Sequence, residues 1–260
     1  MAEYEIKDGV GIIPEGTKKI EHGAFLGCSE LKCITIPDSV TEIDDAAFQK
    51  CTGLTSIVIP NNVEKIGRNV FLGCTGLESI VVSEGNKTYD SRNNCNAIIE
   101  TENNQLLVGC KNTFIPDTVN IIGVDSNWLG VRSAFKKCTG LTDIVLPESV
   151  TEIGRSAFED CTGLKTVVVK GKLKKIPEAA FKNCSALESI TLPAGIGKID
   201  TIAFKGCTSL KTINVPAKKG DYYRERLERC QQFLQDSGKP VWGTLDEIVV
   251  ELPAEKKAKK

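Results

Sequence analysis

The stretch LTDIVLPESVTEIGRSAFEDC, Leu141 to Cys161, returns along the chain in altered copies, such as LTSIVIPNNVEKIGRNVFLGC from Leu54 to Cys74. Each copy carries a Phe, a Cys three residues later and a Leu three residues after that. The Phe residues fall 23 residues apart in two runs: Phe25, Phe48 and Phe71, then Phe135, Phe158, Phe181 and Phe204. A period of this length is typical of a repeat protein built from stacked coils.

The spacing inside the unit predicts its local structure. The Leu-x-x-Ile-x-Ile segment ends in a period-two alternation, which predicts a short strand with one buried face. The Ala-Phe-x-x-Cys segment spaces apolar residues by three, which suits a single helical or 3₁₀ turn. Because 23 residues bury too little surface to fold alone, the coils must stack. We therefore expect an α/β solenoid with a parallel β-sheet on the concave face and short helical or 3₁₀ turns opposite.

The repeated cysteine could be a nucleophile, a metal ligand, half of a disulfide or a core residue. A nucleophile needs a neighbouring base, and the chain has one His, His22. A zinc site is usually built on grouped CxxC pairs, which these spacings do not supply. Parallel stacked side chains rarely offer the dihedral of a disulfide. We interpret the series as free buried thiols: Cys28, Cys51, Cys74, Cys138, Cys161, Cys184 and Cys207.

The repeat resembles the BspA-like leucine-rich repeats of the Treponema pallidum type, whose unit runs roughly LxxIxLPxxLxxIGxxAFxxC. The match covers about residues 12–216. The resemblance implies a curved leucine-rich-repeat solenoid, often cell-surface or secreted, with attachment to host matrix or plasma proteins in some members. It brings no catalytic residues and no cofactor. We place the solenoid in residues 1–216 and a cap with a basic tail in residues 217–260.

The charge and the apolar content of the chain indicate which classes of partner it does not suit. The 33 basic and 34 acidic side chains nearly cancel, so no overall field favours nucleic acid or an anionic membrane. No apolar run approaches the roughly 18–20 residues needed to span a bilayer. The first ten residues, MAEYEIKDGV, lack the features of a secretion signal, which favours either the cytosol or a mature or trimmed chain.

The array is interrupted between Phe71 and Phe135, which lie 64 residues apart rather than 46. The first interruption, about residues 83–113, contains AIIE and QLLVG around TENN and predicts a β-hairpin. If Glu100 pairs with Gln105, Cys95 lies opposite Cys110, and a disulfide could form in an oxidising compartment. The alternative is two free thiols.

The second interruption is VDSNWLGV, residues 124–131, whose removal restores the register. It holds Trp128, the one Trp of the repeat region, beside Asp125 and Asn127. Because Trp is favoured at binding hot spots and loops on rigid scaffolds often carry function, these three residues are candidate ligand contacts. The alternative is a tolerated insertion.

The residues between the inward-facing positions of each strand should line the open face of the sheet. These residues form two neighbouring rows that run across the coils. One row carries mostly hydroxyl side chains, and the other carries mostly β-branched side chains. From these rows we take six candidate ligand contacts: Val58, Val81, Asp143, Val145, Val168 and Thr191. The competing explanation is that Thr and Val simply suit exposed strands.

The 23-residue repeat ends at Pro216. DYYRERLERCQQFLQDSG, Asp221 to Gly238, has helical spacing, and DEIVVEL predicts a final strand. Together they suit a cap that buries the last coil, with Tyr222, Tyr223, Phe233 and Trp242 inside.

The sequence thus predicts a non-catalytic recognition protein of the adhesion type that binds a protein, from matrix or cell surface, or a glycan. The alternative is an intracellular or structural scaffold in the cytoplasm. We expect no enzyme activity, no metal and no cofactor. The motifs NKT at Asn86 and NCS at Asn183 fit the glycosylation pattern, which by itself carries little weight.

Overall fold

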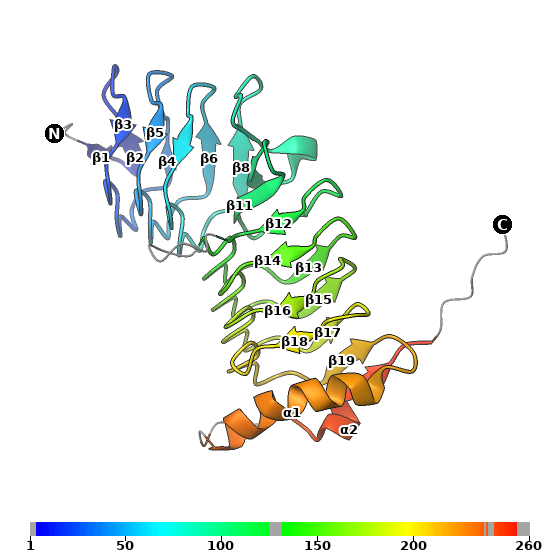
Figure 1. The fold of residues 1–260 in the computed structure, drawn as a ribbon. Coiled ribbons are helices and arrows are strands. Elements are labelled where there is room, and N and C mark those ends of the chain that lie inside the picture. Colours follow the sequence, from blue (N-terminus) through cyan, green and yellow to red (C-terminus); the bar gives the residue numbers. More distant parts are fainter. Residues whose placement is uncertain (1–3, 125–131, 237, 239–241, 254–260) are drawn as a thin grey trace.

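A computed structural model describes residues 4–124, 132–236, 238 and 242–253. The chain winds into a solenoid whose coils follow one another from the N-terminal end to the C-terminal end (Figure 1). The predicted parallel pairing is confirmed, because equivalent residues of successive coils lie side by side. Ile57, for example, pairs with Ile80, and Ile144 pairs with Val167.

The Leu-x-x-Ile-x-Ile segments form the predicted strands. These strands are two to four residues long, and we call them the long strands because most have four: β4 (Cys33–Ile34), β6 (Ser56–Ile59), β8 (Ser79–Val82), β13 (Asp143–Leu146), β15 (Thr166–Val169), β17 (Ser189–Thr191) and β19 (Thr212–Val215). At the N-terminal end, β1 (Glu5–Lys7) and β2 (Val10–Ile12) form an antiparallel hairpin that pairs with β4. We call the exposed surface of these strands the long-strand face.

A second ladder, which the sequence analysis missed, runs along another side of the solenoid. Its two-residue strands are β3 (Lys19–Ile20), β5 (Glu42–Ile43), β7 (Lys65–Ile66), β12 (Ile121–Ile122), β14 (Glu152–Ile153), β16 (Lys175–Ile176) and β18 (Lys198–Ile199). Each contributes one buried Ile to the core, although Ile199 is 6% exposed. Except in β12, each strand holds one apolar residue, and a strand of two residues is too short to show the alternation by which strands are predicted from sequence.

The Phe turns differ from the predicted helical or 3₁₀ turn. They are overlapping turns in which the Cys N–H donates to the Phe carbonyl, as from Cys51 to Phe48 at 3.1 Å. The residue two positions after each Phe has a positive φ, such as Lys50 at 62° and Asp160 at 62°. This left-handed residue prevents the turn from continuing as a helix.

The Phe and Cys ladders fill the interior as predicted. Phe158 stacks on Phe135 and on Phe181, with ring centroids 4.9 and 5.3 Å away. The Cys161 thiol donates to the carbonyl of Phe135 in the preceding coil at 3.0 Å. Cys161 is fully buried, so the core interpretation of this residue is confirmed. Cys28 and Cys138, which begin the two runs of coils, are only partly buried.

The first interruption is the predicted hairpin, with strands β10 (Ala97–Glu100) and β11 (Gln105–Gly109). Before it lie β9 (Tyr89–Asp90) and the 3₁₀ turn η1 (Arg92–Asn94). Glu100 pairs with Gln105 as expected, but a β-bulge at Ile98/Ile99 shifts the register so that Ala97 faces Gly109.

The bulge overturns the geometry on which the Cys95–Cys110 disulfide rested. Continuing the shifted register places Cys110 opposite Asn96, and the Cys110 thiol lies 3.4 Å from the Asn96 carbonyl oxygen. Both thiols are free. They also pack on different sides of the hairpin, Cys95 in one hydrophobic cluster and Cys110 in the other.

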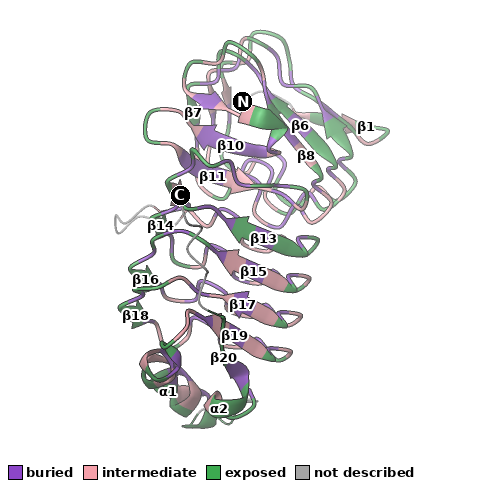
Figure 2. Cartoon of the chain, turned by 90° about the vertical axis from the view of Figure 1, so that its right-hand side faces the viewer, coloured by how far each residue is buried: buried purple, intermediate pink, exposed green. Residues whose placement is uncertain are grey.

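Residues 95–110, which we call the junction hairpin, separate two hydrophobic cores. Ala97 and Ile99 point into the core of the later coils, whereas Ile98 and Leu107 point into the core of the earlier ones. Both strands are mostly buried (Figure 2), and the direction of the coils changes at this point (Figure 1). We call residues 4–91 the N-terminal block and the described residues from 111 onward the C-terminal block.

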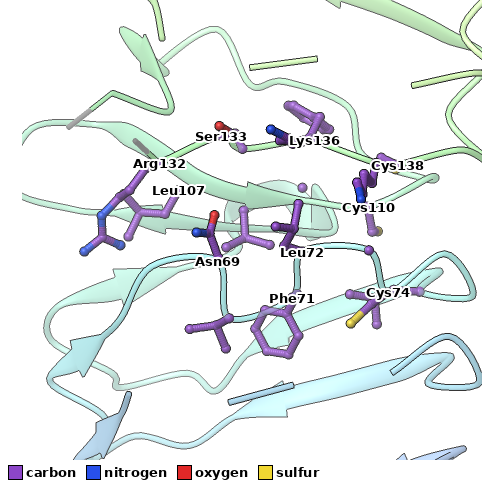
Figure 3. Close-up of a pocket in the computed structure, with 18 of the residues that line it drawn as sticks. Asn69, Phe71, Leu72, Cys74, Leu107, Cys110, Arg132, Ser133, Lys136 and Cys138 are labelled. Atoms are coloured by element: carbon purple, nitrogen blue, oxygen red, sulfur yellow. The ribbon is translucent and has the colours of Figure 1, made fainter. Parts of the chain in front are cut away.

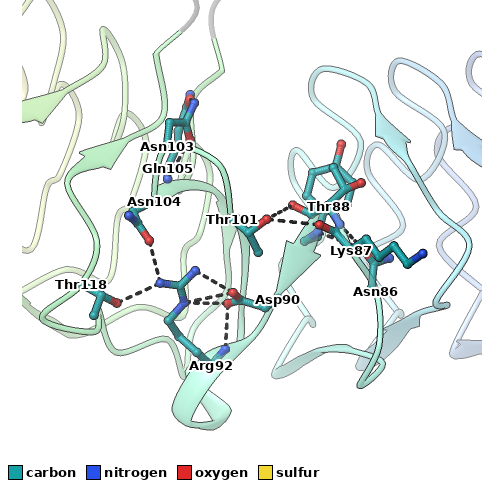
Figure 4. Close-up of polar contacts among 11 residues, drawn as sticks. Asn86, Lys87, Thr88, Asp90, Arg92, Thr101, Asn103, Asn104, Gln105 and Thr118 are labelled. Carbon is teal, nitrogen blue, oxygen red and sulfur yellow. Dashed lines mark hydrogen bonds and ion pairs between the residues drawn. The ribbon is translucent and has the colours of Figure 1, made fainter.

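Polar contacts fasten the interruption to both blocks (Figure 4). Arg92 pairs with Asp90 at 2.6 Å and donates to Asn104 at 2.7 Å and Thr118 at 3.2 Å. The side-chain amide of Asn86 donates to the carbonyls of Pro60 and Val63. The Asn86 amide is therefore engaged inside the fold, which argues against its use as a glycosylation site.

The C-terminal cap consists of α1 (Gly220–Asp236), α2 (Leu245–Ile248) and β20 (Val249–Glu251). The helix agrees with the prediction, but DEIVVEL begins as the short helix α2 and becomes a strand only at Val249. β20 pairs in parallel with β19. The Trp242 ring meets Phe204 edge-on at 5.9 Å and so ends the Phe ladder.

Candidate functional site

The structure places the predicted strand residues on the long-strand face. Val58, Val81 and Val145 are 51%, 44% and 46% exposed. Asp143 is exposed, whereas Val168 and Thr191 are half-buried. The predicted loop contacts Asp125, Asn127 and Trp128 lie outside the described residues.

The ladder of long strands is broken at the junction. β6 and β8 form one sheet, and β13, β15, β17, β19 and β20 form another. On the side of the short strands, the C-terminal block is joined to the junction hairpin, because β11 pairs with β12 and β12 pairs with β14. β10 pairs with β9 of the N-terminal block, whereas β3, β5 and β7 form a separate sheet. The two blocks are therefore joined through the sheet of the junction hairpin, whereas their long strands lie in separate sheets.

Residues 113–116 occupy the place of the missing strand. Phe114 lies 31 residues before Val145, which is the 23-residue period plus the eight residues 124–131. FIPDTV therefore corresponds to VLPESV, and Phe114 belongs to the same row as Val145. The Phe114 side chain is 48% exposed. Phe114 is not among the predicted contacts, because it directly follows the predicted interruption, residues 83–113, and the row was not continued through this coil.

Thr113 explains why this segment does not join β13. It stands at the position of Ile144 in the next coil, and it is 6% exposed. Its hydroxyl donates to the Asn96 carbonyl at 2.6 Å and accepts the Cys110 amide at 2.8 Å. Because a buried hydroxyl needs such partners, Thr113 holds the segment against the junction hairpin.

The gap leaves one edge of β13 open. In the following coils the two amides after each Leu donate to the preceding coil; Lys165 and Thr166 both reach the Thr142 carbonyl, at 2.7 and 3.3 Å. The corresponding amides of Thr142 and Asp143 have no hydrogen-bond partner within the part of the chain that the structure describes. β13 pairs with β15 alone.

A hollow of about 680 Å³ lies between residues 113–117 and β13, and we call it the junction groove. A hollow of this size falls within the range of ligand sites. Phe114 and Val145 supply exposed apolar surface, and three carboxylates lie around them: Asp117, Asp143 and Glu148. Lys170 is the one basic residue among the described residues that line it. The groove is thus apolar with an acidic surround.

A smaller hollow of about 40 Å³ lies on the Phe-turn side of the junction (Figure 3). It separates the turn around Phe71 from the turn around Phe135. Gly109 approaches Phe135 so closely that a Cβ on it would lie 2.1 Å from the ring. The hollow has room for about one or two water molecules, so we assign it no ligand.

Three of the thiols lack the properties of a reactive site. Burial raises the pKa of Cys138 and of Cys230 to about 12, and that of Cys95 to about 11. Such thiols stay protonated at neutral pH and are weak nucleophiles. Among the described residues, no three His, Cys, Asp or Glu side chains are grouped so that they could hold a metal ion. No helix of the described chain is long and apolar enough to cross a bilayer.

The profile of the BspA-type leucine-rich repeat region, in six copies, matches residues 11–115 and 107–233. The chain belongs to this family. Leucine-rich repeat proteins are generally non-catalytic binding scaffolds, and the family implies recognition of other proteins. No curated protein matches the chain.

Three solved structures resemble this BspA-type protein. A leucine-rich cell surface protein from Faecalibacterium prausnitzii is 31% identical, with 78% of this chain and 52% of that one covered and a TM-score of 0.59. A leucine-rich repeat protein from Eubacterium ventriosum is 22% identical (77% and 70% covered, TM-score 0.47). The leucine-rich repeat protein of T. pallidum is 24% identical (80% and 87% covered, TM-score 0.40). The match spans about half the length of the Faecalibacterium protein.

Proposed function

We propose that this BspA-type protein is a non-catalytic recognition module that binds a protein partner at the junction groove. The observation that carries the proposal is the exposed Phe114 beside Val145, within a hollow of ligand size that Asp117, Asp143 and Glu148 also line. Exposed aromatic and aliphatic side chains in a concave, partly polar setting are what protein interfaces use as anchors.

We further propose an adhesion-type role at the cell surface or after secretion, with a matrix or cell-surface protein as the partner. The Faecalibacterium relative is described as a cell surface protein, which supports this location. The near-neutral total charge favours recognition by a local surface over long-range attraction to a polyanion.

Binding to an array of purified proteins, including fibronectin and fibrinogen, and to a glycan array tests the proposal. Wild type is compared with Val145→Glu, and Leu26→Glu serves as the matched control. Val145 and Leu26 are both exposed aliphatic residues, at 46% and 52%, but Leu26 lies on a Phe turn away from the groove.

The proposal requires saturable binding to a protein that Val145→Glu abolishes and Leu26→Glu leaves intact. Binding that neither substitution affects, binding to glycans alone, or no binding at all would refute it. A variant lacking residues 124–131 is tested in parallel, because we propose the loop with Asp125, Asn127 and Trp128 as a second contact. Loss of binding in that variant alone would move the site to the loop.

A scaffold inside the cell is the second candidate, and the thiols favour it. All eleven cysteines are free, as in proteins of reducing compartments. A scaffold that assembles through the long-strand face would form a stable oligomer. Sedimentation at several concentrations would support this alternative if Val145→Glu dissociates an oligomer.

A further inference from the structure

We infer that the junction groove takes an extended, basic segment of a partner protein, which adds to the open edge of β13 as a strand. The inference rests on the proposed function and specifies how the groove would recognise its partner. Strand addition is a general mode of peptide recognition, in which backbone hydrogen bonds bind the segment and side-chain pockets select it.

The backbone of β13 supplies the first part of the argument. The amides of Thr142 and Asp143 have no partner among the described residues, although the same two amides in the following coils are paired. An edge with free donors is a template for another strand. The four-residue length of β13 and the hollow beside it leave room for a short segment.

The side chains of the groove indicate the chemistry of that segment. Successive residues of an added strand would point alternately toward and away from the sheet surface. Residues on the solvent side would contact Phe114 and Val145, which favours side chains with apolar stems. Asp117, Asp143 and Glu148 outnumber Lys170, so the charge is complementary to Lys or Arg. Basic residues combine both properties, because their aliphatic stems pack while their charged ends reach the carboxylates.

The groove is a consequence of the fold and does not depend on a loop closing over it. Thr113 is bonded to the junction hairpin, and Lys111 donates to the Leu77 carbonyl of the N-terminal block at 3.4 Å. The segment that would otherwise pair with β13 is therefore held away from it. The opening is pre-formed, so that a ligand strand would not have to displace a native one.

The experiment uses a capped six-residue peptide that alternates lysine with valine, titrated into the isotopically labelled full chain. Two further peptides serve as probes: the same sequence with glutamate for lysine, and the same sequence with N-methylated amides along one edge. The protein variants are Asp143→Asn and its control Asp38→Asn. Asp38 is also exposed and lies in a PDSV turn that corresponds to PESV, outside the groove.

The inference predicts that the lysine peptide shifts the Thr142 and Asp143 amide signals and slows their hydrogen exchange. Asp143→Asn should weaken binding about threefold, whereas Asp38→Asn should leave it unchanged. N-methylation should weaken binding about tenfold or more, because it removes edge hydrogen bonds. The glutamate peptide should not bind measurably.

Three results would overturn strand addition. One is binding that leaves the two amides unaffected, and another is equal affinity for the N-methylated peptide. The third is protection of the two amides that rises with protein concentration alone, which would assign the edge to a second copy of the chain. Protein binding that depends on Val145 would survive any of these results, so failure of the strand model and failure of the proposed function are separable.

Discussion

The N-terminal and C-terminal blocks use one repeat with different side chains at the position after each Phe. In the N-terminal block this position holds Leu26, Gln49 and Leu72; in the C-terminal block it holds Lys136, Glu159, Lys182 and Lys205. The Phe ladder is nevertheless alike: ring centroids are 5.3 and 5.4 Å apart in the first block and 4.9 to 5.6 Å in the second. The spacing of the coils is therefore set by the buried ladders and not by the neighbouring row.

The same position shows how the C-terminal block accommodates charge. Glu159 is 7% exposed, and its two oxygens lie 2.7 Å from the ammonium groups of Lys136 and Lys182 in the flanking coils. A carboxylate this buried would be strongly destabilising without such partners. In the N-terminal block Gln49 is neutral and needs no ionic partner.

The largest expected contrast is between Phe residues inside a ladder and at its broken end. Phe158 is fully buried between two stacked rings, whereas Phe71, among the described rings, stacks on Phe48 only and lines the small hollow. We expect Phe158→Ala to lower the free energy of unfolding by about 3–5 kcal/mol and Phe71→Ala by about 1 kcal/mol less. Urea unfolding followed by circular dichroism measures both; equal losses would mean that the ladder is not interrupted at Phe71.

The next effect concerns the fit of the junction hairpin between the blocks. Gly109→Ala places a methyl group against Phe135, and overpacking of this kind costs about 1–3 kcal/mol. Gly197→Ala is the control, since the nearest atom to its Cβ is the Lys174 carbonyl oxygen at 3.6 Å. We expect the control to change stability by less than about 0.5 kcal/mol in urea unfolding. A larger loss in the control than in Gly109→Ala would contradict the packing described for the hairpin.

A smaller effect is the pH dependence of stability that Glu159 gives to the C-terminal block. Burial alone would raise the pKa of Glu159, but the ion pairs with Lys136 and Lys182 outweigh it and lower the pKa to about 2. A depressed folded-state pKa adds stability above the ordinary value near 4.5, and this contribution is lost as pH falls toward 2. Glu159→Gln should cost about 1–2 kcal/mol at pH 7 and almost nothing near pH 2.

The pH dependence is measured as the difference in unfolding free energy between wild type and Glu159→Gln from pH 7 to pH 2. Gln49→Glu supplies the converse variant, since it introduces a carboxylate where Leu26 and Leu72 stand in the flanking coils. Stability curves for wild type and Glu159→Gln that stay parallel across this range would show that Glu159 does not titrate with folding.

The smallest effect is expected at the hairpin cysteines. Because the bulge places Cys110 opposite Asn96, we expect both Cys95 and Cys110 to alkylate fully after unfolding under non-reducing conditions. Peptide mapping of protein kept in an oxidising buffer provides the measurement. Recovery of a linked Cys95–Cys110 peptide would restore the original register and the disulfide prediction.

The ladders were predictable because each residue class recurs once per coil at a fixed spacing. The bulge was not, because AIIE and QLLVG are runs of consecutive apolar residues that do not indicate which residue is extra. The groove could have been found, since FIPDTV repeats the pattern of VLPESV, with Thr113 as the polar departure from Ile144. The repeat pattern could not predict the hydrogen-bond acceptor of the Thr113 hydroxyl, because this acceptor is the carbonyl of Asn96 in the hairpin.

The central claim is that the junction opens the sheet at β13 in the free protein. Residue-resolved hydrogen exchange by nuclear magnetic resonance, without any ligand, tests it most directly by comparing the amides of Thr142 and Asp143 with those of Lys165 and Thr166. The account predicts rapid exchange of the first pair and protection of the second, whose hydrogen bonds to Thr142 measure 2.7 and 3.3 Å. Equal protection of both pairs would show that the sheet is continuous and that the groove is closed.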